Sequence, residues 1–136
     1  MRRVVFEYII MGLGVPDPPV DAFATEANHL CSVWWGPGGE HEIAFAQSWK
    51  GQFLWMNPPY SMLDKVVHKL AEESASAILV VPNWPHPLWC RRLQMMVTTS
   101  LFFPRGHRVF ELFGRVCGPS RWGTWAYFIT GTSTVA

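Results

Sequence analysis

The sequence predicts a small, three-layered α/β fold with a mostly parallel sheet, helices on both faces and an antiparallel pair of strands at one edge. Short apolar runs alternate with segments whose apolar residues recur at helical spacing, and proline and glycine separate them. A strand–helix–strand–helix–strand order at this spacing is typical of right-handed βαβ units, which give parallel strands. The last apolar runs are rich in aromatic and β-branched residues and lie close enough along the chain to pair antiparallel.

Three segments are predicted to be helical. Residues 4–13 form the first, because they are apolar over a helical length and Gly14 follows as a stop signal. Residues 62–73 form the second, since their apolar residues recur at helical spacing and Ser61 precedes them as a candidate N-cap. Residues 88–97 form the third, with prolines near their start, where a helix tolerates them.

The predicted strands lie between these helices and after the last of them. The clearest is the run of five apolar residues at 77–81, which Pro82 closes. About 28 residues separate Ala24 from Phe53, so strands in that interval must be abbreviated or missing. The predicted strands span residues 20–24, 53–56, 77–81, 101–103, 109–113 and 125–129.

Composition indicates one folded domain, which we expect to cover residues 1–136. Of the 136 residues, 49% are hydrophobic and 15% are charged, which excludes wholesale disorder. No apolar run is long enough to cross a bilayer, so no membrane partner is expected. The three widely spaced cysteines predict neither a disulfide framework nor a zinc or other metal site. We therefore expect an intracellular protein, cytoplasmic or nuclear.

Charge is distributed unevenly along the chain. Residues 1–83 carry five basic and nine acidic side chains, whereas residues 84–136 carry six arginines and one acidic residue. Arginine suits bidentate contact with phosphate or with base edges, so this part of the chain is a candidate nucleic-acid surface. Two tryptophans after the strand at 77–81 could stack on bases, or they could fill the core instead. The alternative for the arginines is that they simply keep a tryptophan-rich surface in solution. The candidate nucleic-acid contacts are Trp84, Trp89, Arg105, His107, Arg108 and Arg121.

The most informative motif is the loop Asn57-Pro58-Pro59-Tyr60, which joins an apolar strand to a helix. In open α/β sheets ligands bind at the carboxyl ends of strands, where this loop falls. The amide oxygen of Asn57 and the carbonyl of Pro58 could accept both hydrogens of an exocyclic amine such as that of adenine. Tyr60 could stack on a base flipped out of the duplex. The alternative is a rigid strand-to-helix turn with Tyr60 packed in the core.

This loop resembles the catalytic motif of amino-directed, S-adenosylmethionine-dependent DNA methyltransferases. From about residue 20 to 130 the chain is similar to the compact phage-type DNA N-6-adenine methyltransferases, in which an Asp–small segment leads to an Asn and a Cys. Here that segment runs from Asp21 through Asn28 to Cys31. The other similar segments are residues 47–49, 57–60, 78–82, 89, 103–106 and 120–123.

The resemblance implies a small, abbreviated Rossmann-like fold of the class I methyltransferase type, S-adenosylmethionine as cofactor and DNA as the most expected partner. It implies catalytic roles for Asn57, Pro58, Pro59 and Tyr60. It implies cofactor-binding roles for Asp21, Ala22, Phe23, Glu26 and Asn28. Residues 21–25 lack the glycine-rich turn of orthodox methyltransferases, so Asp21 is the leading cofactor residue, with a strand-end turn or cap as its alternative role.

A second resemblance involves some of the same residues. Four stretches, residues 5–7, 14–16, 20–25 and Asn28, are similar to a domain of DIRS-type retroelement polyproteins. So are the alanine-rich strand that ends in Pro–x-Trp-Pro, here residues 78–85, and the tryptophan that follows it, Trp89. That domain lies between the ribonuclease H and recombinase regions, so flanking polyprotein domains are possible partners. Two functions are therefore expected from different classes. The first is a DNA adenine N-6-methyltransferase, and the alternative is a catalytically inactive nucleic-acid-binding or scaffolding domain of a retroelement polyprotein.

Overall fold

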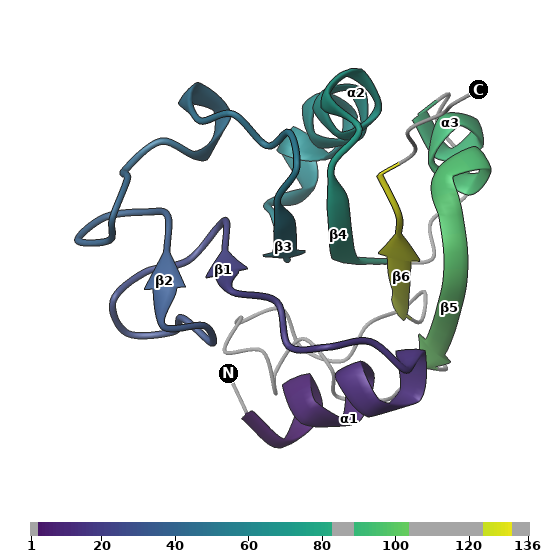
Figure 1. The fold of residues 1–136 in the computed structure, drawn as a ribbon, viewed down its shortest axis with the longest axis horizontal. Coiled ribbons are helices and arrows are strands. Elements are labelled where there is room, and N and C mark those ends of the chain that lie inside the picture. The colour runs from purple at the N-terminus through teal and green to yellow at the C-terminus, as the bar shows by residue number, and fades with distance from the viewer. Residues whose placement is uncertain (1–2, 83–88, 104–123, 132–136) are drawn as a thin grey trace.

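The computed structural model describes residues 3–82, 89–103 and 124–131, which form one six-stranded mixed sheet with helices on both faces (Figure 1). The strand order is β2-β1-β3-β4-β6-β5. The first four strands in this order pair in parallel, and β6 pairs antiparallel with both β4 and β5. The α/β class and the mostly parallel sheet agree with the sequence prediction.

The parallel half of the sheet contains two very short strands. They are β1 (Val20–Asp21) and β2 (Val33–Trp34), and β1 lies between β2 and β3 (Phe53–Met56). The strand β4 (Ser76–Pro82) then pairs with all of β3, from Phe53 opposite Ser76 to Met56 opposite Leu79. The prediction that strands between Ala24 and Phe53 are abbreviated is confirmed by β2, which has two residues.

The antiparallel half of the sheet is built from longer strands. These are β6 (Thr124–Ile129) and β5 (Val97–Phe103), and β5 is the outermost of the described strands. All six residues of β6 pair with β4, and its other edge pairs with β5 through a register shift between Val97 and Thr99. The sequence predicted an antiparallel pair among the final strands at one edge; the structure pairs β5 with β6 in this way, and the predicted strand at 109–113 lies outside the described residues.

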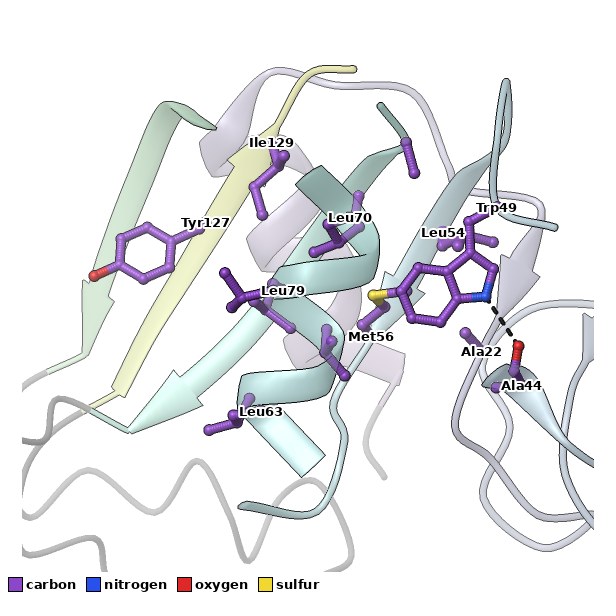
Figure 2. Packing of buried hydrophobic residues seen from close by; sticks show 14 of the residues in the cluster. Ala22, Ala44, Trp49, Leu54, Met56, Leu63, Leu70, Leu79, Tyr127 and Ile129 are labelled. Carbon is purple, nitrogen blue, oxygen red and sulfur yellow. Dashed lines mark hydrogen bonds between the residues drawn. The ribbon is translucent and has the colours of Figure 1, made fainter. Parts of the chain in front are cut away.

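Helices bury the two faces of the sheet in separate hydrophobic clusters. The helix α1 (Arg3–Leu13) covers one face, where its apolar side chains pack on alternate residues of β3, β4 and β6. The helices α2 (Leu63–Glu73) and α3 (Trp89–Met96) cover the opposite face. Figure 2 shows Leu63 and Leu70 of α2 among the cluster on that second face. Burial of these apolar side chains is the main source of stability for a sheet of this kind.

Several predicted boundaries were wrong by a few residues, each for a local reason. A 3₁₀ turn, η2 (Tyr60–Met62), precedes α2, so Met62 and not Ser61 occupies the N-cap position, and no side chain caps the helix. The strand predicted at 101–103 begins already at Val97, because β-branched residues follow α3 without a break. The strand predicted at 20–24 ends at Asp21. The strand predicted at 109–113 lies outside the described residues.

The longest helices in the described part of the chain have 11 residues each. Among residues 3–82, 89–103 and 124–131, none is both long and apolar enough to cross a bilayer.

Candidate functional site

The candidate site lies where the strand order of the sheet reverses. From β1 the chain continues to β2 on one side, whereas from β3 it continues to β4 on the other side. The carboxyl ends of β1 and β3 lie next to each other, since Asp21 pairs with Trp55 and the backbone N–H of Ala22 donates to the Trp55 carbonyl at 2.9 Å. In open α/β sheets a crevice forms outside the strand ends at such a reversal, and ligands bind in it.

Asp21 ends β1 and is a buried acidic residue, with 4% of its surface exposed. Its Oδ2 atom accepts a hydrogen bond from the backbone N–H of Leu30 at 3.0 Å. Burial raises its pKa from 3.8 to about 6, although backbone hydrogen bonds from Leu30 and Phe23 and the nearby His29 oppose this shift. Asp21 therefore connects the end of β1 to the segment that leads into β2, and its raised pKa means that it loses its proton only at about pH 6.

The segments that follow β1 and β2 are joined by backbone hydrogen bonds. The Trp35 N–H donates to the Asp21 carbonyl at 2.9 Å, and the Ala24 N–H donates to the Trp35 carbonyl at 3.1 Å. At Gly36, with φ at 152°, a Cβ atom would lie 1.7 Å from the Ala24 carbonyl oxygen. Only glycine permits this close approach, so the loop after β2 packs directly against the chain that continues from β1.

An aromatic cluster packs next to the end of β1, on the face of the sheet that α2 covers. Phe23, which follows β1, lies edge-to-face against Phe45 and Trp49, with ring centroids at 5.5 and 6.3 Å. Trp49 is fully buried, and its Nε1 donates to the Ala44 carbonyl at 3.0 Å, the bond drawn in Figure 2. Its backbone N–H donates to Oε1 of Glu73 at 2.6 Å. The sequence singled out Trp49 only as part of a motif, whereas the structure gives it a packing role.

The Asn57-Pro58-Pro59-Tyr60 loop leaves β3 at the same edge of the sheet. Asn57 and Pro58 are buried and Pro59 is exposed. The carbonyl of Pro59 accepts the backbone N–H of Met62 at 2.9 Å, which closes the turn into α2. Tyr60 begins this turn, and its side chain lies outside the description. Asn57 therefore lies two residues beyond the Asp21–Trp55 pair, at the same carboxyl edge of the sheet as the end of β1.

The remaining predicted cofactor residues differ in exposure. Ala22 is fully buried, Phe23 is half-buried, and Glu26 and Asn28 are exposed. The Oδ1 atom of Asn28 accepts the backbone N–H of Thr25 at 2.8 Å, so this side chain stabilises the turn after β1. The structure thus brings Asp21, Phe23 and Asn57 to one edge and gives Asn28 a turn-forming contact that the sequence did not predict.

Most of the predicted nucleic-acid contacts lie outside the described residues. These are Trp84, Arg105, His107, Arg108 and Arg121, and Trp89 is described only as the first residue of α3. The structure adds two exposed arginines near the start of α3, Arg91 and Arg92. The sequence counted them in its basic part but did not single them out, because they fall inside a predicted helix.

Contacts with α2 hold Arg92 in place. Its Nη1 atom donates to Nδ1 of His68 at 3.0 Å, since an arginine has no acceptor. The opposite ring nitrogen of His68 lies 3.3 Å from Oε2 of Glu72. Arg92 in the first half of α3 thus contacts the middle of α2, the helix that follows the Asn57 loop along the chain.

A cleft of about 490 Å³ between residues 46–50 and the end of α2 does not belong to this site. It is lined by Lys50, Lys69 and Glu73, and it lies before β3 begins and where α2 ends, at the amino edge of the sheet. Lys69 pairs with Glu73 and lies 5.1 Å from the ring centroid of Trp49. Within the described ranges, no three His, Cys, Asp or Glu side chains gather as metal ligands.

The model of the DNA N-6-adenine-methyltransferase (Dam) family matches residues 3–82, which include α1, the end of β1, the Asn57 loop and all of β4. No curated protein and no solved structure matches the chain.

Proposed function

Since the chain belongs to the DNA N-6-adenine-methyltransferase (Dam) family, we propose that it binds S-adenosylmethionine at the crevice between β1 and β3 and methylates the amino group of adenine in DNA. The observation that carries the proposal is the meeting of Asp21 and the Asn57 loop at the reversal of strand order. The matched segment contains both. The strand order also supports an abbreviated, Rossmann-like methyltransferase fold.

The residues at the end of β1 fit the chemistry of this cofactor. Asp21 and Glu26 offer carboxylates to an ammonium or to ribose hydroxyls, and Phe23 offers an apolar ring to a purine. Ala22 and Ala24 are buried and small, so the backbone can approach a ligand without the glycines of other methyltransferases. The carboxylate of Asp21 is largely removed from water, which strengthens any hydrogen bond that it accepts. When bound, the cofactor supplies an electrophilic methyl group.

The Asn57 loop would hold the other reactant. The side-chain oxygen of Asn57 and the carbonyl of Pro58 would accept the two hydrogens of the adenine amine, and Tyr60 would stack on the extruded base. The consecutive prolines fix the backbone of this loop, so the acceptors are oriented before the base arrives. The amine can react before it loses its proton, so no general base has to act first. Alignment and electrostatic stabilisation would supply most of the rate acceleration.

DNA would be held by basic side chains. Arg91 and Arg92 are exposed, and Arg92 is oriented by His68, so both are suited to phosphate contacts. Arg105, His107, Arg108 and Arg121 stay predictions of the same kind, as do base stacking by Trp84 and Trp89. The retroelement resemblance also stays a prediction, and its inactive binding domain is the alternative that the following experiment separates.

The experiment is calorimetric titration with S-adenosylmethionine or S-adenosylhomocysteine, followed by a methyl-transfer assay on DNA. We expect Asp21→Ala to weaken cofactor binding about tenfold or more, because a buried acceptor is lost. Asn57→Ala should leave cofactor binding close to wild type and slow methyl transfer about 100-fold. Asp17→Ala, which changes an exposed acid near β1, is the matched control and should change neither.

Two results would contradict the proposal. One is the absence of binding heat from folded wild-type protein at high cofactor concentration. The other is an Asn57→Ala variant that transfers methyl groups at the wild-type rate. In the first case, salt-dependent binding of nucleic acid without cofactor would support the inactive binding domain.

A further inference from the structure

The outer edge of the sheet is unusual in its composition. Among the described strands β5 lies at this edge; it has seven residues, Val97–Phe103, and contains neither a charged residue nor a proline. An edge strand presents unpaired backbone N–H and C=O groups, and monomeric proteins protect such edges with charges, prolines or very short strands. The strand β2 at the opposite edge has two residues and so follows this rule, whereas β5 has only a register shift near its start.

Exposed apolar side chains gather beside β5. The described residues include six large apolar side chains that are exposed, and four of them lie on β5 or on the helices next to it. Tyr8 and Met11 project from α1, which packs on β5 through the Tyr8–Phe103 ring contact at 5.9 Å. Phe102 lies on β5 itself against Trp125 at 4.7 Å, and Met95 lies in the last turn of α3, two residues before β5. Apolar surface therefore flanks this edge strand on both faces of the sheet.

We propose that β5 pairs antiparallel with β5 of a second copy of this chain, so that two sheets join into one continuous sheet of twelve strands. A twofold axis perpendicular to the sheet, near Ser100 in the middle of the strand, would place each residue opposite its mirror position. A strand with charged residues near its centre would bring like charges together in such an arrangement, and β5 has none. This neutrality favours a second copy over a partner strand that is selected by charge.

The same symmetry accounts for the apolar surface on both faces. An axis perpendicular to the sheet keeps α1 of each copy on the same face, so Tyr8 and Met11 of one copy would approach those of the other. On the opposite face, Phe102 and Met95 would be covered in the same way. Backbone hydrogen bonds would align the copies, and burial of these side chains would supply the apolar area that a stable interface needs.

This inference is independent of the proposed methyl transfer. Three strands, β3, β4 and β6, separate β1 from the β5 edge, so the pairing leaves both candidate sites toward the far ends of the joined sheet. The two sites of the dimer would be open at the same time.

The experiment is sedimentation velocity of the wild-type chain over a wide range of concentrations. We expect a mass of twice 15.5 kDa for the wild type. Ser100→Lys should raise the dissociation constant of the dimer about 100-fold, because it places like charges opposite each other near the axis. Ile43→Lys is the matched control, since it removes another exposed apolar side chain far from this edge along the chain and should leave the dimer intact.

Circular dichroism would verify that each variant is folded. Met11→Lys on α1 tests the same interface without touching β5, and we expect it to weaken the dimer as well. A wild type that stays at 15.5 kDa at every concentration would overturn the proposal and leave the edge to a strand of a different protein. Dimers of equal stability in folded Ser100→Lys and Ile43→Lys would overturn it too.

Discussion

The two halves of the sheet are held together in different ways. In the half formed by β4, β6 and β5, strands of six or seven residues pair along almost their whole length. In the half that carries the candidate site, β1 and β2 have two residues each. Side chains there replace the missing backbone pairing, since Asp21 binds the Leu30 N–H, and Trp49 binds the Ala44 carbonyl.

The half with long strands therefore acts as the scaffold, and the half with short strands carries the candidate site. A long ladder distributes its stabilisation over many backbone hydrogen bonds, so the loss of one side chain lowers stability without changing the architecture. The short-strand half depends on a few buried contacts, so a single substitution can disorder the surface on which a ligand would bind. Proteins often place binding sites in such locally less stable regions because the loops there can be shaped independently of the core.

The largest effect is expected from Trp49→Ala compared with Leu79→Ala. Both side chains are fully buried, Trp49 in the short-strand half and Leu79 on β4. Trp49→Ala should lower the free energy of unfolding by about 3–5 kcal/mol and Leu79→Ala by about 2–5 kcal/mol, measured by urea unfolding. The comparison predicts that Trp49→Ala also weakens cofactor binding in the folded fraction, whereas Leu79→Ala does not. Equal binding losses would show that the two halves behave as one unit.

A smaller effect concerns pH and Asp21. Its pKa is raised from 3.8 to about 6 on folding, mainly by burial, so the folded protein holds this proton more tightly than the unfolded chain does. The resulting contribution to stability is therefore present below about pH 4 and is lost as the pH rises through about 6, with a magnitude of about 3 kcal/mol. Asp21→Asn keeps an acceptor for the Leu30 N–H but has no such titration.

The measurement for Asp21 is the free energy of unfolding between pH 4 and 7. Relative to Asp21→Asn, the wild type should lose stability as the pH rises through this window. Asp17→Asn, a change of an exposed acidic residue three residues before β1, controls for the removal of a charge and should follow the wild-type profile. Parallel profiles for wild type and Asp21→Asn would mean that the carboxyl is not desolvated in solution.

The smallest effect on stability is expected at Ser74, the C-cap residue of α2. Ser74 follows this helix in the left-handed conformation, with φ at 51°, where glycine is favoured. Ser74→Gly should raise the free energy of unfolding by up to about 1 kcal/mol, because it relieves this conformational cost. Thermal unfolding would measure the change, with Ser61→Gly, outside the left-handed region, as the control. A Ser74→Gly variant that is less stable than the wild type would contradict the left-handed conformation of Ser74.

Much of the fold could be predicted from local pattern. The helix at 63–73 and the strands at 53–56 and 76–82 lie where apolar periodicity and proline placed them, because each buries a regular set of side chains. The strand β2 could not be located, since two residues carry no periodicity. The direct passage from α3 to β5 was also missed, because propensity alone does not fix the residue at which a helix ends.

The sequence predicted individual residues of the candidate site better than it predicted that they lie close together. Asp21 and the Asn57 loop stand out in the sequence because buried strands end in polar residues there. Their meeting depends on β1 pairing with β3, a contact between residues far apart in the chain. The hydrogen bond from Leu30 to Asp21 and the close packing of Gly36 on Ala24 are also tertiary contacts, which no local sequence pattern predicts.

Cys31 lies in the core between α1 and the sheet, one residue after the backbone amide that Asp21 binds. Burial, with a contribution from Asp21, raises the pKa of its thiol to about 12, so the sulfur stays protonated at neutral pH and is a poor nucleophile while α1 is in place. A thiol of this kind becomes reactive when the layer above it opens. Peptide mass spectrometry can follow how fast an alkylating reagent modifies Cys31. That rate therefore measures how often α1 detaches from the sheet.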